Sequence, residues 1–141
     1  MRLLVSACLL GAACRYDGQS RQNEAVMRLL EAHELIPVCP EQLGGLPTPR
    51  APAEIRGDRV ISRRGDDVTD AYQRGAEETL RLCRLLRCDG AVLKARSPSC
   101  GRDQVYDGAF AGVLTPGRGV TAAKLLAEGI PVWTEEDAAA L

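Results

Sequence analysis

The sequence predicts a single α/β domain over residues 1–141, a three-layer α/β/α sandwich that is Rossmann-like or flavodoxin-like. Short apolar runs alternate with amphipathic stretches along the chain, which is typical of βαβ units with a parallel sheet. The length suits one buried core, since domains of about 100–150 residues are the most common. We therefore expect a mainly parallel sheet of about four to five strands, with helices on both faces.

The first half of the chain contains two predicted core strands and a long loop. Apolar runs at 2–7 and 35–39 predict buried strands, and helical spacing over 23–33 predicts a helix between them. Residues 40–57 are rich in proline and glycine, which predicts a loop, and a loop this long in a compact domain is usually functional. Residues 58–62 are expected to form a short edge strand.

The second half continues the alternation of helices and strands. A long amphipathic helix is predicted from 70 to about 87, with Thr69 as its N-cap. The elements expected after it are strand 90–95, loop 96–119, helix 121–128, strand 130–133 and helix 135–141.

Several classes of protein are excluded by what the sequence lacks. No run approaches the roughly 18 apolar residues of a membrane helix. Neither a dinucleotide-binding GxGxxG motif nor a Walker A loop is present. The net charge of −1 gives no electrostatic indication of a nucleic acid or membrane partner. The apolar N-terminal run is interpreted as the first strand rather than as a signal peptide, so we expect a cytoplasmic protein with reduced thiols.

Three of the 6 cysteines occupy equivalent places in the predicted fold. Cys8, Cys39 and Cys100 each follow one of the first three predicted core strands. Because the carboxyl ends of parallel strands meet at one edge of a sheet, we expect the three thiols to lie close together. The one histidine, His33, belongs to a helix away from that edge, and no CxxC pair occurs. Soft thiolates gathered without histidine favour an iron–sulfur cluster or zinc.

The other cysteines have less defined roles. Cys83 belongs to the apolar stripe of the long helix and Cys88 precedes the amino end of a strand, so both are expected to be structural. Cys14 follows Cys8 on the same loop, and three interpretations stay open for it: a fourth ligand, a resolving thiol or a bystander.

The segments around these cysteines resemble the 2-thiouracil desulfidase family, formerly a domain of unknown function. The matching motifs form an ordered set between Ser6 and Leu126 that is highly specific as a whole. They are SACLLG-x-x-CRYDG, CPE-x-x-GGLPTPR-x-PAEI, GDDVT, LK-x-RSPSCG, YDG-x-F-x-G and GRGVTAAKLL, in which Lys124 departs from the family pattern.

The resemblance implies a [4Fe-4S] cluster held by only three cysteines, which map to Cys8, Cys39 and Cys100. The position of Cys14 can carry another residue in the family, so Cys14 stays outside the implied ligand set. The fourth iron would then be open, as in catalytic metal sites, and would bind the thiocarbonyl sulfur of a substrate. The implied reaction is a non-redox hydrolysis of the C–S bond that releases sulfide.

Two residues beside the ligands are candidates for catalysis. Glu41 follows Cys39 by two residues and is the only carboxylate of its motif, so it could activate water or protonate the substrate nitrogen. Ser97 is held extended by Pro98, and its hydroxyl could orient water or the substrate.

Substrate-binding candidates flank the ligand loops. Ser99 is an alternative to Ser97, and the ring of Tyr16 could stack on a pyrimidine while Asp17 bonds its edge. A salt bridge within the loop is the competing interpretation for this cluster, which consists of Arg15, Tyr16 and Asp17. Arg50 is a candidate for binding or bracing.

The implied substrate is a thiolated pyrimidine as free base, nucleoside or nucleotide, or within tRNA, handled by a monomer or homodimer without a membrane partner. One alternative is a non-catalytic iron–sulfur or zinc-carrying module for redox sensing or binding, with Cys14 as its fourth ligand. A second is a small α/β scaffold whose cysteines are merely buried.

Overall fold

Four parallel strands form the central sheet of the computed structural model, which describes residues 1–141. The strand order is β2-β1-β5-β8, with bounds Arg2–Ser6 (β1), Glu34–Val38 (β2), Gly90–Leu93 (β5) and Val132–Thr134 (β8). Every neighbouring pair is parallel, so the four carboxyl ends lie at one edge. The order reverses between β1 and β5, the kind of position at which doubly wound sheets bind ligands. The predicted α/β class is confirmed.

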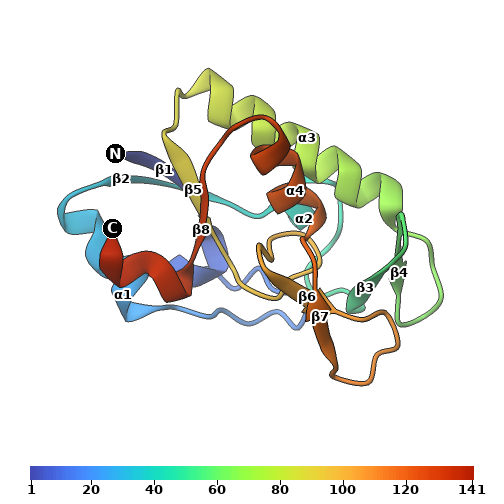
Figure 1. Ribbon diagram of the computed structural model, residues 1–141. Helices are drawn as coiled ribbons and strands as arrows, with labels where there is room; N and C mark the ends of the chain where they lie inside the picture. The colour runs from blue at the N-terminus through green and yellow to red at the C-terminus, as the bar shows by residue number, and fades with distance from the viewer.

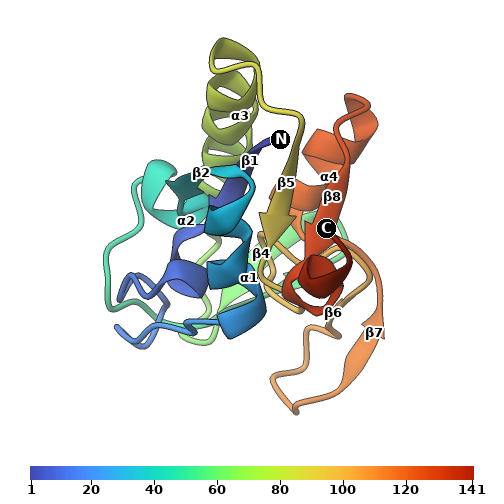
Figure 2. The same ribbon diagram turned by 90° about the vertical axis from the view of Figure 1, so that its left-hand side faces the viewer.

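Helices cover both faces of this sheet (Figures 1 and 2). One face packs against α3 (Thr69–Leu85) and α4 (Val120–Ala127), and the other packs against α1 (Glu24–Arg28) and the C-terminal 3₁₀ helix Glu135–Ala140. Alternate residues of β1 supply the two cores, since Leu4 belongs to the first while Leu3 and Val5 belong to the second.

Two small hairpins stand apart from the sheet, and three of their four strands fall in segments predicted as loops. Residues 40–57 contain the short helix α2 (Pro40–Leu43) and β3 (Ala53–Arg56), which pairs antiparallel with β4 (Arg59–Ser62). The short edge strand expected at 58–62 is present as β4, and its partner is β3 rather than a strand of the main sheet. The tight turn that follows Arg56 lets β4 fold back onto β3 instead.

The second long loop also contains a hairpin. Within residues 96–119, β6 (Gln104–Tyr106) pairs antiparallel with β7 (Leu114–Pro116). Each strand has only three residues, which is too short for a period-2 pattern to be visible in the sequence. In Figure 1 this hairpin and the β3–β4 hairpin lie on the same side of the molecule.

Helix boundaries differ from the predictions at their ends. The helix predicted over 23–33 is a short α1 capped by the Asn23 side chain, followed by a 3₁₀ turn at Leu29–Glu31. Thr69 is the first residue of α3 rather than its cap, because its hydroxyl accepts a hydrogen bond from the Val60 amide. No helix of the chain has the length and apolar character needed to cross a membrane.

Candidate active site

A cavity of about 550 Å³ opens at the carboxyl edge of the sheet, next to the ends of β1, β2 and β5. Cys8, Cys39 and Cys100 all line it, and so does Cys14. Cys14 packs in one cluster with Cys8 and Cys39, and the Cys39 thiol donates to the carbonyl oxygen of Cys14 (3.8 Å). The structure thus brings together the three cysteines singled out in the sequence and adds the fourth beside them.

Each of these thiols is placed by a turn that ends a strand. Cys8 belongs to the 3₁₀ turn Ala7–Leu10, which closes at Gly11 with a φ of 101°, a value that favours glycine. Cys39 is the N-cap residue of α2. Cys100 belongs to a turn built on Ser97, whose Oγ accepts hydrogen bonds from the amides of Ser99 (3.1 Å) and Cys100 (3.0 Å).

Two of the thiols are held strongly in their protonated form. Burial raises the pKa of the Cys100 thiol to about 12. The hydrogen bond with Cys14, followed by burial, raises the pKa of the Cys39 thiol far above its usual range. Metal ions bind thiolates, so binding at this site must release protons.

The donor set fits a cluster better than a single ion. No group of three or more His, Cys, Asp and Glu side chains is placed to hold one metal ion, whereas structural zinc needs four converging ligands. An iron–sulfur cluster presents a separate iron to each thiolate, so its ligands need not converge on one point. Cys8, Cys39 and Cys100, which approach the cavity from three strand ends, are suited to that arrangement.

The remaining cysteines and the histidine lie elsewhere. Cys83 packs in the core between α3 and the sheet, with Cys88 partly buried beside it. The Nδ1 atom of His33 lies 3.1 Å from the amino group of Met1 at the opposite edge of the sheet.

Glu41 forms a buried ion pair in the cavity wall. Its Oε2 atom lies 2.5 Å from Nη2 and 2.7 Å from Nε of Arg50, and the two side chains are only 12% and 8% exposed. Arg50 also donates to the carbonyl oxygens of Cys14 (3.1 Å) and Pro47 (3.1 Å). Arg50 therefore braces Glu41 against the loop that carries Cys14. Of the two roles predicted for Arg50, binding or bracing, the contacts correspond to bracing.

The two serines have different positions. Ser97 lines the cavity, and its Oγ accepts two amide hydrogen bonds, which leaves its own proton free to be donated. Ser99 is buried, bonds to the hydroxyl of Thr121 (2.9 Å) and does not line the cavity. The structure therefore gives Ser99 a packing contact rather than access to a ligand.

The three residues of the predicted Arg15–Tyr16–Asp17 cluster do not all line the cavity. Arg15 and Tyr16 line the cavity, with the guanidinium 5.5 Å from the centre of the ring. Nη1 of Arg15 is buried without a hydrogen-bond partner, so this donor is available to a ligand. Asp17 borders a neighbouring groove, accepts a hydrogen bond from the Gln19 amide and lies 3.9 Å from Arg15, which matches the loop salt bridge weighed as the alternative.

Sequence reasoning missed Tyr72 and Lys94, which also line the cavity. Tyr72 is 3% exposed on the first turn of α3, where burial and the nearby Glu41 carboxylate raise the pKa of its hydroxyl. Extending the apolar stripe of α3 by one turn, from Ala76 back to Tyr72, would have found it.

Both hairpins contribute to the outer wall of the cavity. The Glu54 carboxylate on β3 accepts hydrogen bonds from the amides of Gly108 (2.9 Å) and Phe110 (3.2 Å), between β6 and β7. Ala53, Glu54, Tyr106 and Phe110 all line the cavity. The hairpins are thus joined to each other where they cover the site.

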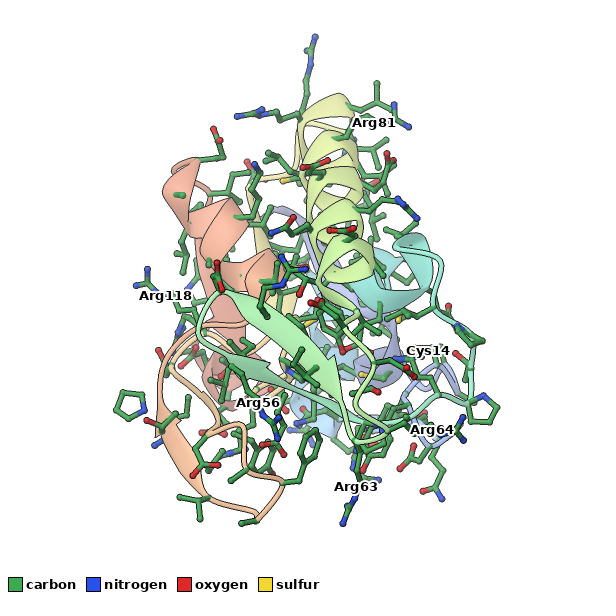
Figure 3. All side chains as sticks on the ribbon, turned by 90° about the vertical axis from the view of Figure 1, so that its right-hand side faces the viewer. Cys14, Arg56, Arg63, Arg64, Arg81 and Arg118 are labelled. Atoms are coloured by element: carbon green, nitrogen blue, oxygen red, sulfur yellow. The ribbon has the colours of Figure 1, made fainter.

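Cationic side chains predominate around the cavity. Figure 3 shows Arg56, Arg63 and Arg64 at the end of the molecule where Cys14 lies, and Arg81 at the opposite end of α3. The lining carboxylates are Glu41 and Glu54, against the lining cations Arg15, Arg21, Arg50, Arg63, Lys94 and Arg96. Four of these cations already have a carboxylate partner, which leaves Arg21 and Arg63 as the cations free to attract a negatively charged ligand.

Comparisons with known proteins agree with one another. The model of the 2-thiouracil desulfurase family matches residues 3–137. The uncharacterized protein YbbK of Bacillus subtilis (strain 168) is 39% identical, and the match covers 96% of this chain and 96% of that protein. A solved structure of the [4Fe-4S]-dependent thiouracil desulfidase TudS superimposes with a TM-score of 0.91 at 45% identity, and the match covers 96% of this chain and 91% of that one.

Proposed function

Because this chain belongs to the 2-thiouracil desulfurase family, we propose that it hydrolyses the C–S bond of a thiolated pyrimidine and releases sulfide. One water supplies the oxygen that replaces the thiocarbonyl sulfur, so no net electron transfer is needed. The observation that carries the proposal is the gathering of Cys8, Cys39 and Cys100 around one cavity that also contains Glu41 and Ser97.

The proposed cofactor is a [4Fe-4S] cluster held by Cys8, Cys39 and Cys100. Three protein ligands would leave one iron of the cluster open as a Lewis acid for the soft thiocarbonyl sulfur. Cys14 is proposed to stay outside the ligand set, next to Cys8 and Cys39.

Glu41 is proposed to move the protons of the reaction. Its carboxylate could accept a proton from the attacking water and return one to the pyrimidine nitrogen. Arg50 fixes the carboxylate by its two short contacts to Oε2. The hydroxyl of Ser97 is proposed to donate a hydrogen bond to the substrate or to the water, since both of its acceptor contacts are already made by the backbone.

Arg21 and Arg63, the lining cations without a carboxylate partner, favour a nucleotide over the free base as the substrate. Arg15 offers an unpaired guanidinium nitrogen, and the Tyr16 ring beside it could stack on a pyrimidine. Arg21 and Arg63 line the same cavity and could contact a phosphate. These contacts support a pyrimidine bound with its thiocarbonyl group toward the cysteines and its negative charge toward the arginines.

The proposal is tested by anaerobic purification, cluster reconstitution and assays of iron and acid-labile sulfide. The loaded protein is then incubated with 2-thiouracil, 4-thiouridine and 4-thiouridine monophosphate, and sulfide release is followed. We expect sulfide from at least one substrate, with the highest kcat/KM for the nucleotide. A protein that takes up no iron, or a loaded protein that releases no sulfide from any of the three, contradicts the proposal.

The position of Cys14 favours one alternative, a cluster-carrying module without catalytic activity. Cys14 lies beside two of the proposed ligands, and its thiolate could serve as the fourth protein ligand of the cluster. In that case the loaded protein would bind its cluster through four cysteines and would release no sulfide.

A further inference from the structure

The fourth strand of the sheet also delivers functional side chains to the cavity edge. The segments that follow β1, β2 and β5 each carry a cysteine, whereas β8 ends at Thr134 and is followed at once by Glu135, Glu136 and Asp137. Because β8 is the neighbour of β5 in the sheet, these three carboxylates arrive next to the loop that carries Cys100. Each of them contacts that loop.

Glu135 holds the start of the Cys100 loop with both of its oxygens. Oε1 accepts a hydrogen bond from the Ala95 amide (2.7 Å), and Oε2 lies 3.0 Å from the ammonium group of Lys94. Lys94 Nζ also donates to the Ala95 carbonyl oxygen (3.0 Å). The Glu135 side chain is 11% exposed, so these charge-assisted contacts are little weakened by water.

Asp137 holds the far side of the same loop. Its Oδ2 atom lies 2.6 Å from Nη1 of Arg102 and accepts a hydrogen bond from the Thr134 amide (2.9 Å), so it is itself fixed by the capping box of the 3₁₀ helix. Glu136 differs from its neighbours. Its ion pair with Arg96 (2.7 Å) joins two half-exposed side chains, and such pairs contribute little.

We propose that Glu135 is a positioning residue for Cys100, assisted by Asp137, and that these two carboxylates fix the loop so that its thiol faces the other cysteines. The contacts lie on both sides of Cys100, at Lys94 and Ala95 before it and at Arg102 after it. Chain connectivity alone does not fix this loop, because β5 ends at Leu93 and the next strand begins at Gln104. The inference rests on the proposed function in that Cys100 is a proposed cluster ligand.

The test compares Glu135→Ala and Glu135→Gln with Glu136→Gln as the matched control. The first readout is the rate at which reconstituted protein releases iron to a ferrous chelator under anaerobic conditions. We expect release about tenfold faster in Glu135→Ala, which removes both contacts. Glu135→Gln should fall between this variant and the parent, because its amide oxygen still accepts from Ala95 while the ion pair with Lys94 is lost. Glu136→Gln should stay within about twofold of the parent.

The second readout needs no cluster. In cluster-free protein, the alkylation rate of each cysteine is measured by quantitative mass spectrometry. The inference expects faster alkylation of Cys100 in Glu135→Ala with no change at Cys83, which lies in the core away from the loop. Equal increases at both cysteines would show a general loosening and would overturn the inference. So would parental rates of iron release and alkylation in Glu135→Ala.

The two readouts also separate this inference from the proposed function. If the parent protein takes up no cluster, the proposed function fails while Cys100 alkylation still decides the role of Glu135. If Glu135→Ala does not fold, the same two measurements on Lys94→Met decide it, since this variant loses the ion pair and the Lys94 hydrogen bond to the Ala95 carbonyl oxygen but keeps the contact of Glu135 with the Ala95 amide. An unchanged rate at Cys100 in that folded variant would count against the inference.

Discussion

At the scale of single residues, the four cavity cysteines are expected to differ in whether the cluster needs them as ligands. Cys39→Ser should lose the cluster, whereas Cys14→Ser should retain it, because three thiolates suffice in the proposed ligand set. Iron and acid-labile sulfide per chain, measured after identical anaerobic reconstitution, check this. An iron content in Cys14→Ser as low as in Cys39→Ser would move Cys14 into the ligand set and favour the non-catalytic module.

The carboxylate charge of Glu41 is expected to be needed for turnover, even when the size of the side chain is kept. Glu41→Gln should keep the iron content of the parent and lower kcat by about 10²-fold, at the lower end of typical acid–base contributions. The control is Glu128→Gln, which removes an exposed partner of Arg84 far from the cavity. Parental kcat in Glu41→Gln at full cluster loading would remove this carboxylate from the reaction.

At the scale of elements, the contact between α2 and α3 determines where Cys39 and Glu41 lie. A Cβ atom added at Gly75 would collide with the carbonyl oxygen of Pro40, and one at Gly44 would collide with that of Ala71. The two helices therefore touch through their backbones, and only glycine allows this.

Gly75→Ala should push α2 away from α3 and destabilise the protein by about 2 kcal/mol, the usual range for overpacking. Urea unfolding measures the loss, and iron release from the loaded protein should be faster because Cys39 moves with α2. Gly117→Ala is the control, since the nearest atom to its added Cβ is a side-chain methyl of Val105 at 3.2 Å. Similar free energies of unfolding for both variants would contradict this account.

The start of α3 should make stability depend on pH in acid. Hydrogen bonds from Thr69, followed by the contact with Arg59, lower the pKa of Asp67 to about 2 from 3.8. A lowered carboxyl pKa stabilises the fold above the unfolded value, and this contribution is lost as pH falls from about 4 to about 2. Asp67→Asn should therefore lose less stability than the parent over this window. Thermal unfolding at several pH values checks it, with the exposed Asp58→Asn as control.

At the scale of the whole molecule, cluster binding is expected to join three strand ends that are otherwise connected only by the sheet. Loading should raise Tm by about 5 °C or more, because a group that binds only the folded state stabilises it. Anaerobic calorimetry of loaded and cluster-free protein measures this. Cys14→Ser should show the same increase, and Cys100→Ser should show none. An equal Tm for both forms of the parent would mean that the cluster does not link these segments.

The parallel sheet and the meeting of its cysteines at one edge could be predicted from the sequence, because the carboxyl ends of parallel strands lie at the same edge of a sheet. The strand at 58–62 could be predicted, whereas its partner β3 and the strands β6 and β7 could not be, since three- and four-residue strands show too few repeats of an alternating pattern. Glu135 and Arg50 act through partners that are distant in sequence or lie across a turn, so their roles depend on how elements pack. The role of Glu135, for example, can be inferred only once β8 is placed beside β5.

The separation of the two hairpins from the main sheet has a consequence for diversification. The cysteines belong to strand ends of the sheet, while Ala53, Glu54, Tyr106 and Phe110 reach the cavity from the hairpins. The cysteine loops and the hairpin wall of the cavity thus come from separate parts of the chain, and Glu54 joins the two hairpins to each other. Exchanging the hairpins between relatives is a route to altered ligand preference that leaves the sulfur-bearing framework untouched.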